Sequence, residues 1–222
     1  MIIPISYEGL PYFIGALAVF ICVGLVFRIF SFKKIAVACY VLALVSACCM
    51  LYFFRDPARV SPNDPSAVLA GADGTVTGIE TVQENRFLNT ETVRISIWLS
   101  LFDVHINRNP MSGKVSFLGY FPGSHYFTIQ PKSSELNHHS SIVIEGEKTS
   151  CLVNQIVGPI VKRVVYWLNL NQYVTAGERF GMMKFGSRLD TYLPKSDVIV
   201  TVKVGQKVTA GETIIATIKT KD

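Results

Sequence analysis

Two long apolar segments near the N-terminus constrain the fold of this chain more than any other feature. Residues 9–27 contain no charged side chain, and residues 35–54 contain none either. A helix of about 20 apolar residues is long enough to cross a hydrocarbon core about 30 Å thick. The short link between the segments contains Arg28, Lys33 and Lys34. The sequence therefore predicts an antiparallel helical hairpin over residues 1–54 that anchors the chain in a membrane.

A cleaved signal peptide and a pair of buried core helices are the alternatives to this hairpin. Glu8 stands where a signal peptide would carry its basic region, and a second apolar segment follows the first at once. Helices that are apolar on every side are rare inside small domains. The link contains three basic residues, and the segment after the hairpin contains two, Arg55 and Arg59. This excess of one residue favours a cytoplasmic link but does not settle the orientation.

Charge and cysteine content narrow the choice of partners. The net charge is +5 over 222 residues and the chain has no long Lys/Arg run, so nothing in the composition supports binding to nucleic acid. A weakly basic protein at a membrane is instead suited to an anionic lipid surface. All cysteines except Cys151 lie in the apolar segments, and their spacing predicts neither a disulfide framework nor a metal site.

Residues 55–222 are expected to form a mainly β domain, a barrel or a sandwich. Short stretches with β-branched and aromatic residues recur between glycine and proline turns, and no convincing helical period follows residue 55. The clearest stretches are 93–99, 142–144, 161–167 and 198–204.

An internal repeat lies within this β region. Residues 171–178 and 205–212 are identical at six of eight positions and share the pattern Gln-x-Val-Thr-Ala-Gly-Glu. The pattern resembles the tight turns between strands in the hybrid barrels of biotinyl and lipoyl carrier domains. The carrier lysine between methionines is absent, so we expect the repeat to be a scaffold that holds residues 179–204 in a rigid β frame.

Four sequence blocks, in order, resemble the phosphatidylserine decarboxylases of the compact membrane-bound branch. They are Phe-Arg-Asp-Pro at 54–57, Ala-Gly-Ala-Asp-Gly at 70–74, Phe-Asp-Val-His-Ile-Asn-Arg-Asn-Pro at 102–110 and Phe-Gly-Ser-Arg at 185–188. The better-known form of the last block is Leu-Gly-Ser-Thr, and Phe-Gly-Ser-Arg is similar to the short-chain form. The resemblance covers nearly the whole chain. It implies an enzyme that converts phosphatidylserine to phosphatidylethanolamine with a pyruvoyl cofactor derived from Ser187.

The chemistry of such a cofactor explains the Gly186-Ser187 pair. The serine hydroxyl attacks the preceding carbonyl, the resulting ester breaks by β-elimination, and hydrolysis leaves a ketone that can form a Schiff base with the substrate amine. Gly186 has no Cβ and so permits the backbone conformation and the close approach that this attack needs. The expected products are a large chain, 1–186, and a small chain, 187–222, which the second repeat would retain in the barrel.

The serine needs a base, because a hydroxyl is a weak nucleophile at its free pKa. His105 is the candidate, with an ordinary pKa of about 6.5. Asp73 could orient its imidazole as in a Ser-His-Asp relay, and Asp103 is a weaker candidate for that role. Better-known family members use a second histidine of the same motif for decarboxylation. That position here holds Arg108, so whether His105 serves one step or both stays open.

Several further residues have weaker assignments. Arg55, Arg59 and Arg188 are candidates for contacts with the substrate phosphate or carboxylate, because the guanidinium fork suits such groups. Arg108 either pairs with Asp103 or binds lipid phosphate. The pair His138-His139 has no partner at metal-ligand spacing and is expected to lie in a solvated loop, and no metal is predicted.

Two alternative functions remain open. The repeats alone would fit a non-enzymatic, membrane-anchored hybrid-barrel adaptor, which would not need Gly186-Ser187. A decarboxylase of an ether-linked phosphatidylserine analogue would use identical head-group chemistry. The resemblance implies an inner-membrane protein with its catalytic domain on the cytoplasmic face. The sequence leaves open whether the protein is a homodimer and how deeply the hairpin enters the bilayer.

Overall fold

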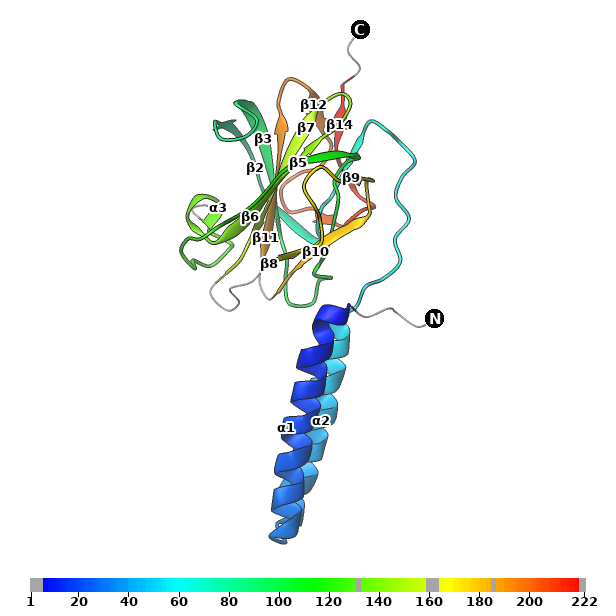
Figure 1. Ribbon diagram of the computed structural model, residues 1–222, viewed down its shortest axis with the longest axis vertical. Coiled ribbons are helices and arrows are strands. Elements are labelled where there is room, and N and C mark those ends of the chain that lie inside the picture. Colours follow the sequence, from blue (N-terminus) through cyan, green and yellow to red (C-terminus); the bar gives the residue numbers. More distant parts are fainter. Residues whose placement is uncertain (1–5, 131–132, 159–163, 185–186, 220–222) are drawn as a thin grey trace. The chain divides into compact units, whose positions relative to one another are not determined.

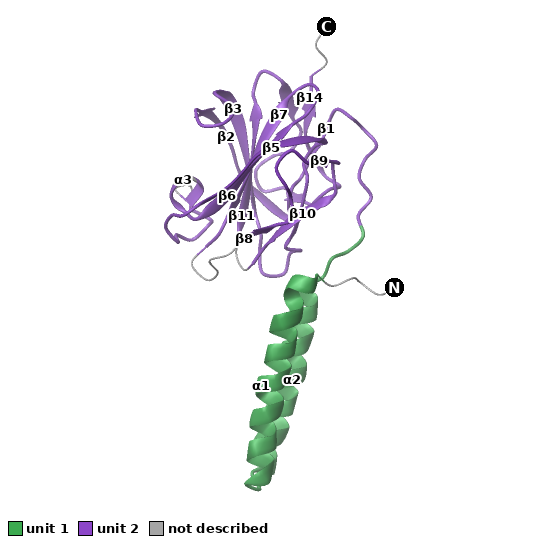
Figure 2. Ribbon diagram, in the orientation of Figure 1, with its two compact units in different colours: residues 1–58 green, residues 59–222 purple. Residues whose placement is uncertain are grey.

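The computed structural model describes residues 6–130, 133–158, 164–184 and 187–219. The chain forms two compact units, Met1–Ala58 and Arg59–Asp222 (Figure 2). Their boundary falls close to the predicted division after residue 54. Each unit is described by itself below.

The first unit is a pair of apolar helices. A short 3-10 helix, η1 (Tyr7–Gly9), leads into α1 (Leu10–Ile29), and α2 (Lys33–Phe53) runs back beside it (Figure 1). Both helices are long and apolar enough to cross a membrane. The predicted helical hairpin is confirmed, and its crossing of a bilayer stays a prediction.

Small residues line the contact between these two helices. The buried positions of α2 include Ala36, Cys39, Ala43 and Ala47, which recur at helical spacing. Gly24 of α1 lies against the ring of Tyr40, and a methyl group at that glycine would lie 2.5 Å from the ring. Close packing of backbones through small residues is how helices associate in lipid, where no hydrophobic force drives them together.

The second unit is mainly β, as predicted. An eight-stranded antiparallel sheet, curled in Figure 1, has the order β13-β2-β3-β11-β7-β6-β5-β9. In chain order, these strands are β2 (Gly74–Glu84), β3 (Thr90–Trp98), β5 (Gly113–Phe121), β6 (His139–Glu145), β7 (Ser150–Ile156), β9 (Tyr173–Val174), β11 (Arg188–Pro194) and β13 (Lys207–Val208).

Two smaller sheets and one helical turn complete this unit. The first sheet joins β1 (Ala67–Leu69), β14 (Ile214–Ile218) and β12 (Val198–Val200). The second joins β4 (Ile106–Arg108), β10 (Arg179–Met183) and β8 (Val164–Tyr166). The four-residue helix α3 (Ser133–Leu136) was not expected from the sequence. The expected strand over 198–204 is shorter than predicted, and residues 161–163 of another lie outside the described residues.

The central strands of the large sheet are buried on both faces. On one face, Ile95 and Ile97 of β3 and Leu189 and Leu193 of β11 join the main apolar core. Because successive side chains of a strand point to opposite faces, the side chains between these residues, such as Asp190, lie on the other face of the sheet. That face is polar and partly covered, and its side chains include Arg94, Ser96, Arg188, Asp190 and Tyr192.

The two copies of the repeat form turns at glycines with positive φ. Gly177 (φ +80°) lies between β9 and β10, and Gly211 (φ +73°) lies between β13 and β14. Strands β9 and β13 pair with β5 and β2 at the two edges of the large sheet. The turns nevertheless meet, since a methyl group at Gly211 would lie 3.3 Å from Cα of Gly177. The repeat is therefore structural, as predicted.

Candidate active site

Ser187 is fully buried and directly precedes β11. The backbone N–H of Leu99 donates to the carbonyl oxygen of Ser187 over 3.0 Å, which extends the pairing of β3 with β11 by one residue. Among the described residues, Oγ of Ser187 is buried and has no hydrogen-bond partner. Most buried hydroxyls in proteins are hydrogen-bonded, and an unpaired one costs about 1–3 kcal/mol. The other half of the expected cleavage site, Gly186, lies outside the described residues.

His105 is also fully buried, and its ring has a defined orientation. Its Nδ1 lies 2.9 Å from the carbonyl oxygen of Asp103. A carbonyl oxygen can only accept, so Nδ1 carries the proton and Nε2 is the basic nitrogen of the neutral ring. The tautomer is therefore the one that a general base needs.

The topology brings His105 close to the strand that leads to Ser187. The N–H of Met183, at the end of β10, donates to the carbonyl oxygen of His105 over 3.2 Å. The next residue, Ile106, is paired with Met182 in the β4–β10 ladder. Leu99, which is hydrogen-bonded to Ser187, is connected to His105 by the segment 99–105. His105 is thus tied to the end of β10, and Ser187 to the residue that follows β3, in two different sheets.

The carboxylate of Asp103 is fixed by its own loop. It accepts hydrogen bonds from the N–H and Oγ of Ser100, at 2.8 and 2.6 Å, and lies 3.6 Å from Nζ of Lys207. Burial opposes ionisation, but the bonds from Ser100 and the charge of Lys207 outweigh it and hold the pKa of Asp103 below its ordinary value. Asp103 therefore orients His105 through its backbone carbonyl.

Asp73 lies at the second repeat turn. Its Oδ1 accepts the N–H of Ala210 over 2.7 Å, and its Oδ2 pairs with Nη2 of Arg59 at 2.8 Å. Arg59, a candidate for a substrate contact, also reaches Glu212 at 3.4 Å. These contacts connect Asp73 to the scaffold of the domain, and its expected role toward His105 stays a prediction.

Comparison with known proteins decides the family. The sequence model of the family described as phosphatidylserine decarboxylase matches residues 47–216. This chain belongs to that family. The match includes the blocks that contain Asp73, His105 and Ser187, so the resemblance drawn from the sequence is confirmed.

Two curated relatives show the same similarity over nearly their full lengths. Both are named phosphatidylserine decarboxylase proenzyme. One, from Desulfotalea psychrophila (strain LSv54 / DSM 12343), is 39% identical over 219 residues, which cover 97% of this chain and 97% of the relative. The other, from Nitrosomonas eutropha (strain DSM 101675 / C91 / Nm57), is 38% identical over 215 residues, which cover 96% and 94%.

In this member of the phosphatidylserine decarboxylase family, Arg188 takes part in a buried ion pair. Its Nε donates to Oδ1 of Asp190 over 2.7 Å, and its Nη2 donates to Oγ of Ser96 over 2.7 Å. Oγ of Ser134 in α3 donates to the other oxygen of Asp190 over 2.6 Å. The residue that follows Ser187 is thereby anchored. Sequence reasoning missed Asp190, although Arg-x-Asp on a strand places both side chains on one face.

The other two arginines proposed for substrate contact also have structural partners. Nη1 of Arg108 donates to the carbonyl oxygen of Gly177 over 2.8 Å and so supports the first repeat turn. Arg55, in the helical unit, donates to the carbonyl oxygen of Tyr52 over 2.8 Å, and its guanidinium lies 4.0 Å above the Tyr52 ring. Contact of either residue with substrate stays a prediction.

A buried network of hydrogen-bonded side chains, which includes Asn107 two residues after His105, was not anticipated. Nε2 of Gln155 donates to Oδ1 of Asn107 over 2.7 Å, and Oγ of Ser140 donates to Oε1 of Gln155 over 2.7 Å. All three residues are fully buried. These hydrogen bonds link β4 to β7 and β6. A satisfied polar network of this kind fixes one arrangement of the strands.

The expectation of a solvated loop at His138-His139 was wrong for His139. His139 begins β6, is 7% exposed, and its Nδ1 lies 2.8 Å from the carbonyl oxygen of Asn137. Its ring stacks on Phe121, with centroids 5.2 Å apart. His138 is partly exposed and accepts the N–H of Gly123 at its Nδ1 over 3.0 Å. Strand pairing with β7, which the sequence does not specify, buries His139.

Proposed function

We propose that this chain is a self-processing phosphatidylserine decarboxylase whose pyruvoyl group derives from Ser187. The observation that supports this most directly is the fully buried Oγ of Ser187, which has no hydrogen-bond partner among the described residues. A buried hydroxyl left unpaired at the one serine of the family's cleavage block is expected of a nucleophile rather than of a packing residue. The residues present therefore fit the group.

Self-cleavage would proceed as an acyl shift followed by elimination. Oγ of Ser187 attacks the carbonyl carbon of Gly186 and gives its proton to Nε2 of His105, whose other nitrogen is fixed by Asp103. The C–N bond breaks, the nitrogen takes a proton, and an ester remains. Loss of the Cα proton of residue 187 then breaks the ester C–O bond, leaving a carboxylate on Gly186 and dehydroalanine at 187. Water converts the dehydroalanine to the ketone and releases ammonia.

His105 is also our candidate for the proton transfers of decarboxylation. The pyruvoyl group supplies an electron-accepting carbonyl for the electron pair that is released when CO₂ leaves the serine head group. A proton must then be returned to that carbon. Arg108, in the position of the family's second histidine, stays protonated at all working pH values and is bound to Gly177, so it cannot act as a base. His105 would then serve both steps.

Asp73 is proposed to assist His105 from its position just before β2, where it accepts a hydrogen bond from Ala210. The variant Asp73→Asn keeps the size of the side chain and removes its charge. If Asp73 supports the base, self-cleavage should slow at least tenfold while the unfolding temperature falls only slightly. An equal loss of stability and cleavage would instead assign Asp73 to the scaffold alone.

The substrate and location proposed are those of a membrane lipid enzyme. Phosphatidylserine, with its primary amine, carboxylate and phosphate, is the proposed substrate, and phosphatidylethanolamine is the product. The helices of the first unit would hold the enzyme at the inner membrane, with the β unit on the cytoplasmic face, because a two-tailed lipid leaves a bilayer reluctantly. Flotation of the full chain with anionic vesicles tests the attachment.

The intact mass of the purified protein tests the central step. We expect two chains, 1–186 and 187–222, with the smaller one blocked by a carbonyl that borohydride reduces. Ser187→Ala should stay uncut, whereas Ser196→Ala, which changes an exposed serine of the same chain, should cleave normally. His105→Gln should stop cleavage, with His125→Gln as its matched control. A single chain of full mass with unmodified Ser187 would favour a non-enzymatic binding module instead.

The lipid is tested separately. Vesicles that contain phosphatidylserine should yield phosphatidylethanolamine and CO₂ with the cleaved protein. Turnover of an ether-linked analogue at the same kcat/KM would show that the enzyme recognises the head group and not the linkage to the acyl or alkyl tails.

A further inference from the structure

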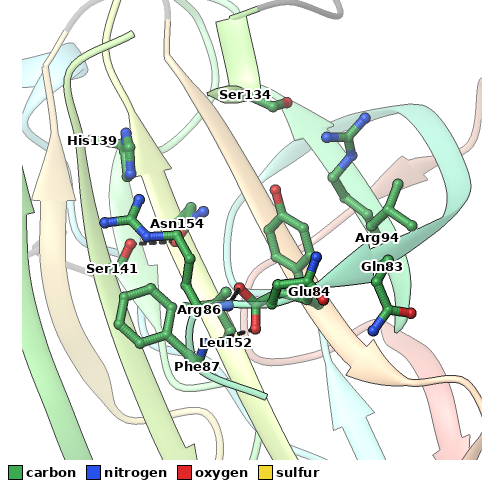
Figure 3. Close-up of a pocket in the computed structure, with 13 residues that line it drawn as sticks. Gln83, Glu84, Arg86, Phe87, Arg94, Ser134, His139, Ser141, Leu152 and Asn154 are labelled. Carbon is green, nitrogen blue, oxygen red and sulfur yellow. Dashed lines mark hydrogen bonds between the residues drawn. The ribbon is translucent and has the colours of Figure 1, made fainter. Parts of the chain in front are cut away.

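A cavity of about 360 Å³ lies on the polar face of the large sheet. Its lining comes from strands β2, β3, β6, β7 and β11, from α3, and from the loop after β2 (Figure 3). Tyr192 of β11 lines it, whereas its neighbour Leu193 faces the apolar core. Neither Ser187 nor His105 is among the residues that line it.

The carboxylate at this cavity already accepts hydrogen bonds from the backbone. Glu84 is the one acidic side chain among the described lining residues. Its carboxylate accepts the N–H groups of Arg86, Phe87 and Leu88 at 2.9, 2.9 and 2.6 Å. These three backbone donors hold the carboxylate in place. Glu84 therefore shapes the loop and is not available to pair with an arginine.

The guanidinium donors of the lining, in contrast, are incompletely hydrogen-bonded. The side chain of Arg94 is 7% exposed. Its guanidinium pairs with Glu80 and also interacts with Tyr192 and Asp190, but its buried Nε has no hydrogen-bond partner in the described parts of the chain. The guanidinium of Arg86 lies 4.4 Å above the ring of Phe121 and forms no hydrogen bond or ion pair with a described residue. A buried donor left unpaired is costly, so the cavity is expected to hold an acceptor.

The remaining polar groups of the lining are neutral. Burial, with a smaller contribution from Asp190, raises the pKa of Tyr192 to about 12, so its hydroxyl stays protonated. Burial first, and then the charge of Arg86, lower the pKa of His139. Figure 3 shows His139 and Ser141 on the same side as Arg86, and Ser134 on the side of Arg94. The cavity thus combines two cations with hydroxyl and imidazole groups.

We propose that this cavity binds the phosphate group of a small phosphate monoester or of a phospholipid head group. Guanidinium groups bind phosphate oxygens in paired, charge-assisted hydrogen bonds. Because Arg86 and Arg94 approach from two sides, they suit the tetrahedral oxygens of phosphate better than a planar carboxylate (Figure 3). The volume exceeds that of phosphate alone and leaves room for a polar group of the size of glycerol. The site requires neither self-cleavage nor the pyruvoyl group.

Calorimetric titration of the full chain, in micelles of a zwitterionic detergent, tests the proposal. The probes are sn-glycerol 3-phosphate and a short-chain phosphatidylglycerol, which separate a soluble ester from a lipid head group. We expect saturable binding of at least one probe, weakened at least tenfold in Arg86→Gln. Arg86→Lys should bind with intermediate affinity, because it keeps the charge and loses the planar fork.

The choice of variant keeps the test independent of folding. Arg86 is exposed at its loop, whereas Arg94→Gln would leave Glu80 without its partner and is not used. Lys203→Gln removes one exposed positive charge from another turn and should leave binding unchanged. The proposal is overturned if neither probe binds, or if Arg86→Gln binds both probes as tightly as the unaltered chain. Normal self-cleavage of Arg86→Gln would show that the site acts apart from Ser187.

Discussion

At the scale of single residues, the pair Arg188–Asp190 explains how the new chain end could stay in place after cleavage. Both side chains are nearly or fully buried, and their charges are 2.7 Å apart. Removing one partner of such a pair leaves an uncompensated buried charge, at a cost of about 3–5 kcal/mol. Arg188 directly follows Ser187, so loss of its anchor also displaces the nucleophile.

Asp190→Asn should therefore slow self-cleavage at least tenfold and lower the unfolding temperature. Both effects can be followed in one preparation, by the fraction of cut chain over time and by a thermal melt. Glu91→Gln is the control, because Glu91 forms an exposed ion pair with Lys195 at 3.1 Å, and exposed pairs contribute little. Normal cleavage by Asp190→Asn would show that Arg188 does not position Ser187.

His139 makes the stability of the fold depend on pH. Burial and the charge of Arg86 lower its pKa in the folded state, while the unfolded chain keeps the ordinary value of about 6.5. Below that value the unfolded state binds a proton that the folded state resists. The free energy of unfolding therefore falls as the pH drops from 6.5 to the folded pKa, by up to about 1.4 kcal/mol per pH unit, and then levels off.

Thermal unfolding at pH 7.5 and pH 5.5 tests this contribution. The difference in unfolding temperature between the two pH values should be smaller for His139→Gln than for the unaltered chain. The other titratable groups are the same in His139→Gln and in the unaltered chain, so their contribution cancels when the two pH differences are compared. Identical pH profiles would mean that His139 is protonated equally in both states.

At the scale of elements, two glycines of the second repeat form the turns before and after β13. Gly205 and Gly211 both have positive φ, +88° and +73°. A methyl group at Gly205 would meet nothing within 4 Å, whereas one at Gly211 would lie 2.8 Å from Cδ of Arg108. Substitution by alanine therefore carries the same backbone penalty, about 1 kcal/mol, at both sites, and a steric clash at one.

Gly211→Ala should lower the unfolding temperature more than Gly205→Ala, by several degrees. The difference between the two unfolding temperatures measures how closely Arg108 packs against Gly211. Arg108 also donates a hydrogen bond to Gly177 of the first repeat turn. Equal melting temperatures would show that Arg108 moves aside at no cost.

Sequence patterns predicted the elements better than the contacts between them. Alternation located β3, the octapeptide pattern located both turns, and charge-free runs located α1 and α2, because these signals are local. The contact between Asp73 and Ala210 spans 137 positions, and the burial of His139 depends on pairing with β7. Such facts follow from register and long-range topology, which a single sequence does not specify.

At the scale of the whole molecule, the strand order predicts that the two expected chains stay together. Cleavage after Gly186 would assign β11, β12, β13 and β14 to the small chain. Strand β11 lies between β3 and β7 in the large sheet, and β14 lies between β1 and β12. The small chain is thus interleaved with the large one and contributes Leu189, Leu193 and Ile215 to the shared core.

We expect the cleaved protein to elute as one species in size-exclusion chromatography in mild detergent, at any dilution that can be detected. The chains should separate only in denaturant, in the same transition in which the β unit unfolds, because exposing β11 breaks both of its ladders and opens the core. Ser187→Ala, which stays covalently intact, provides the reference for an uncut fold. Its unfolding should be independent of protein concentration, whereas that of the cleaved form should shift to higher temperature as concentration rises, since two chains must reassemble. Release of the small chain before the β unit unfolds would contradict the interleaved topology.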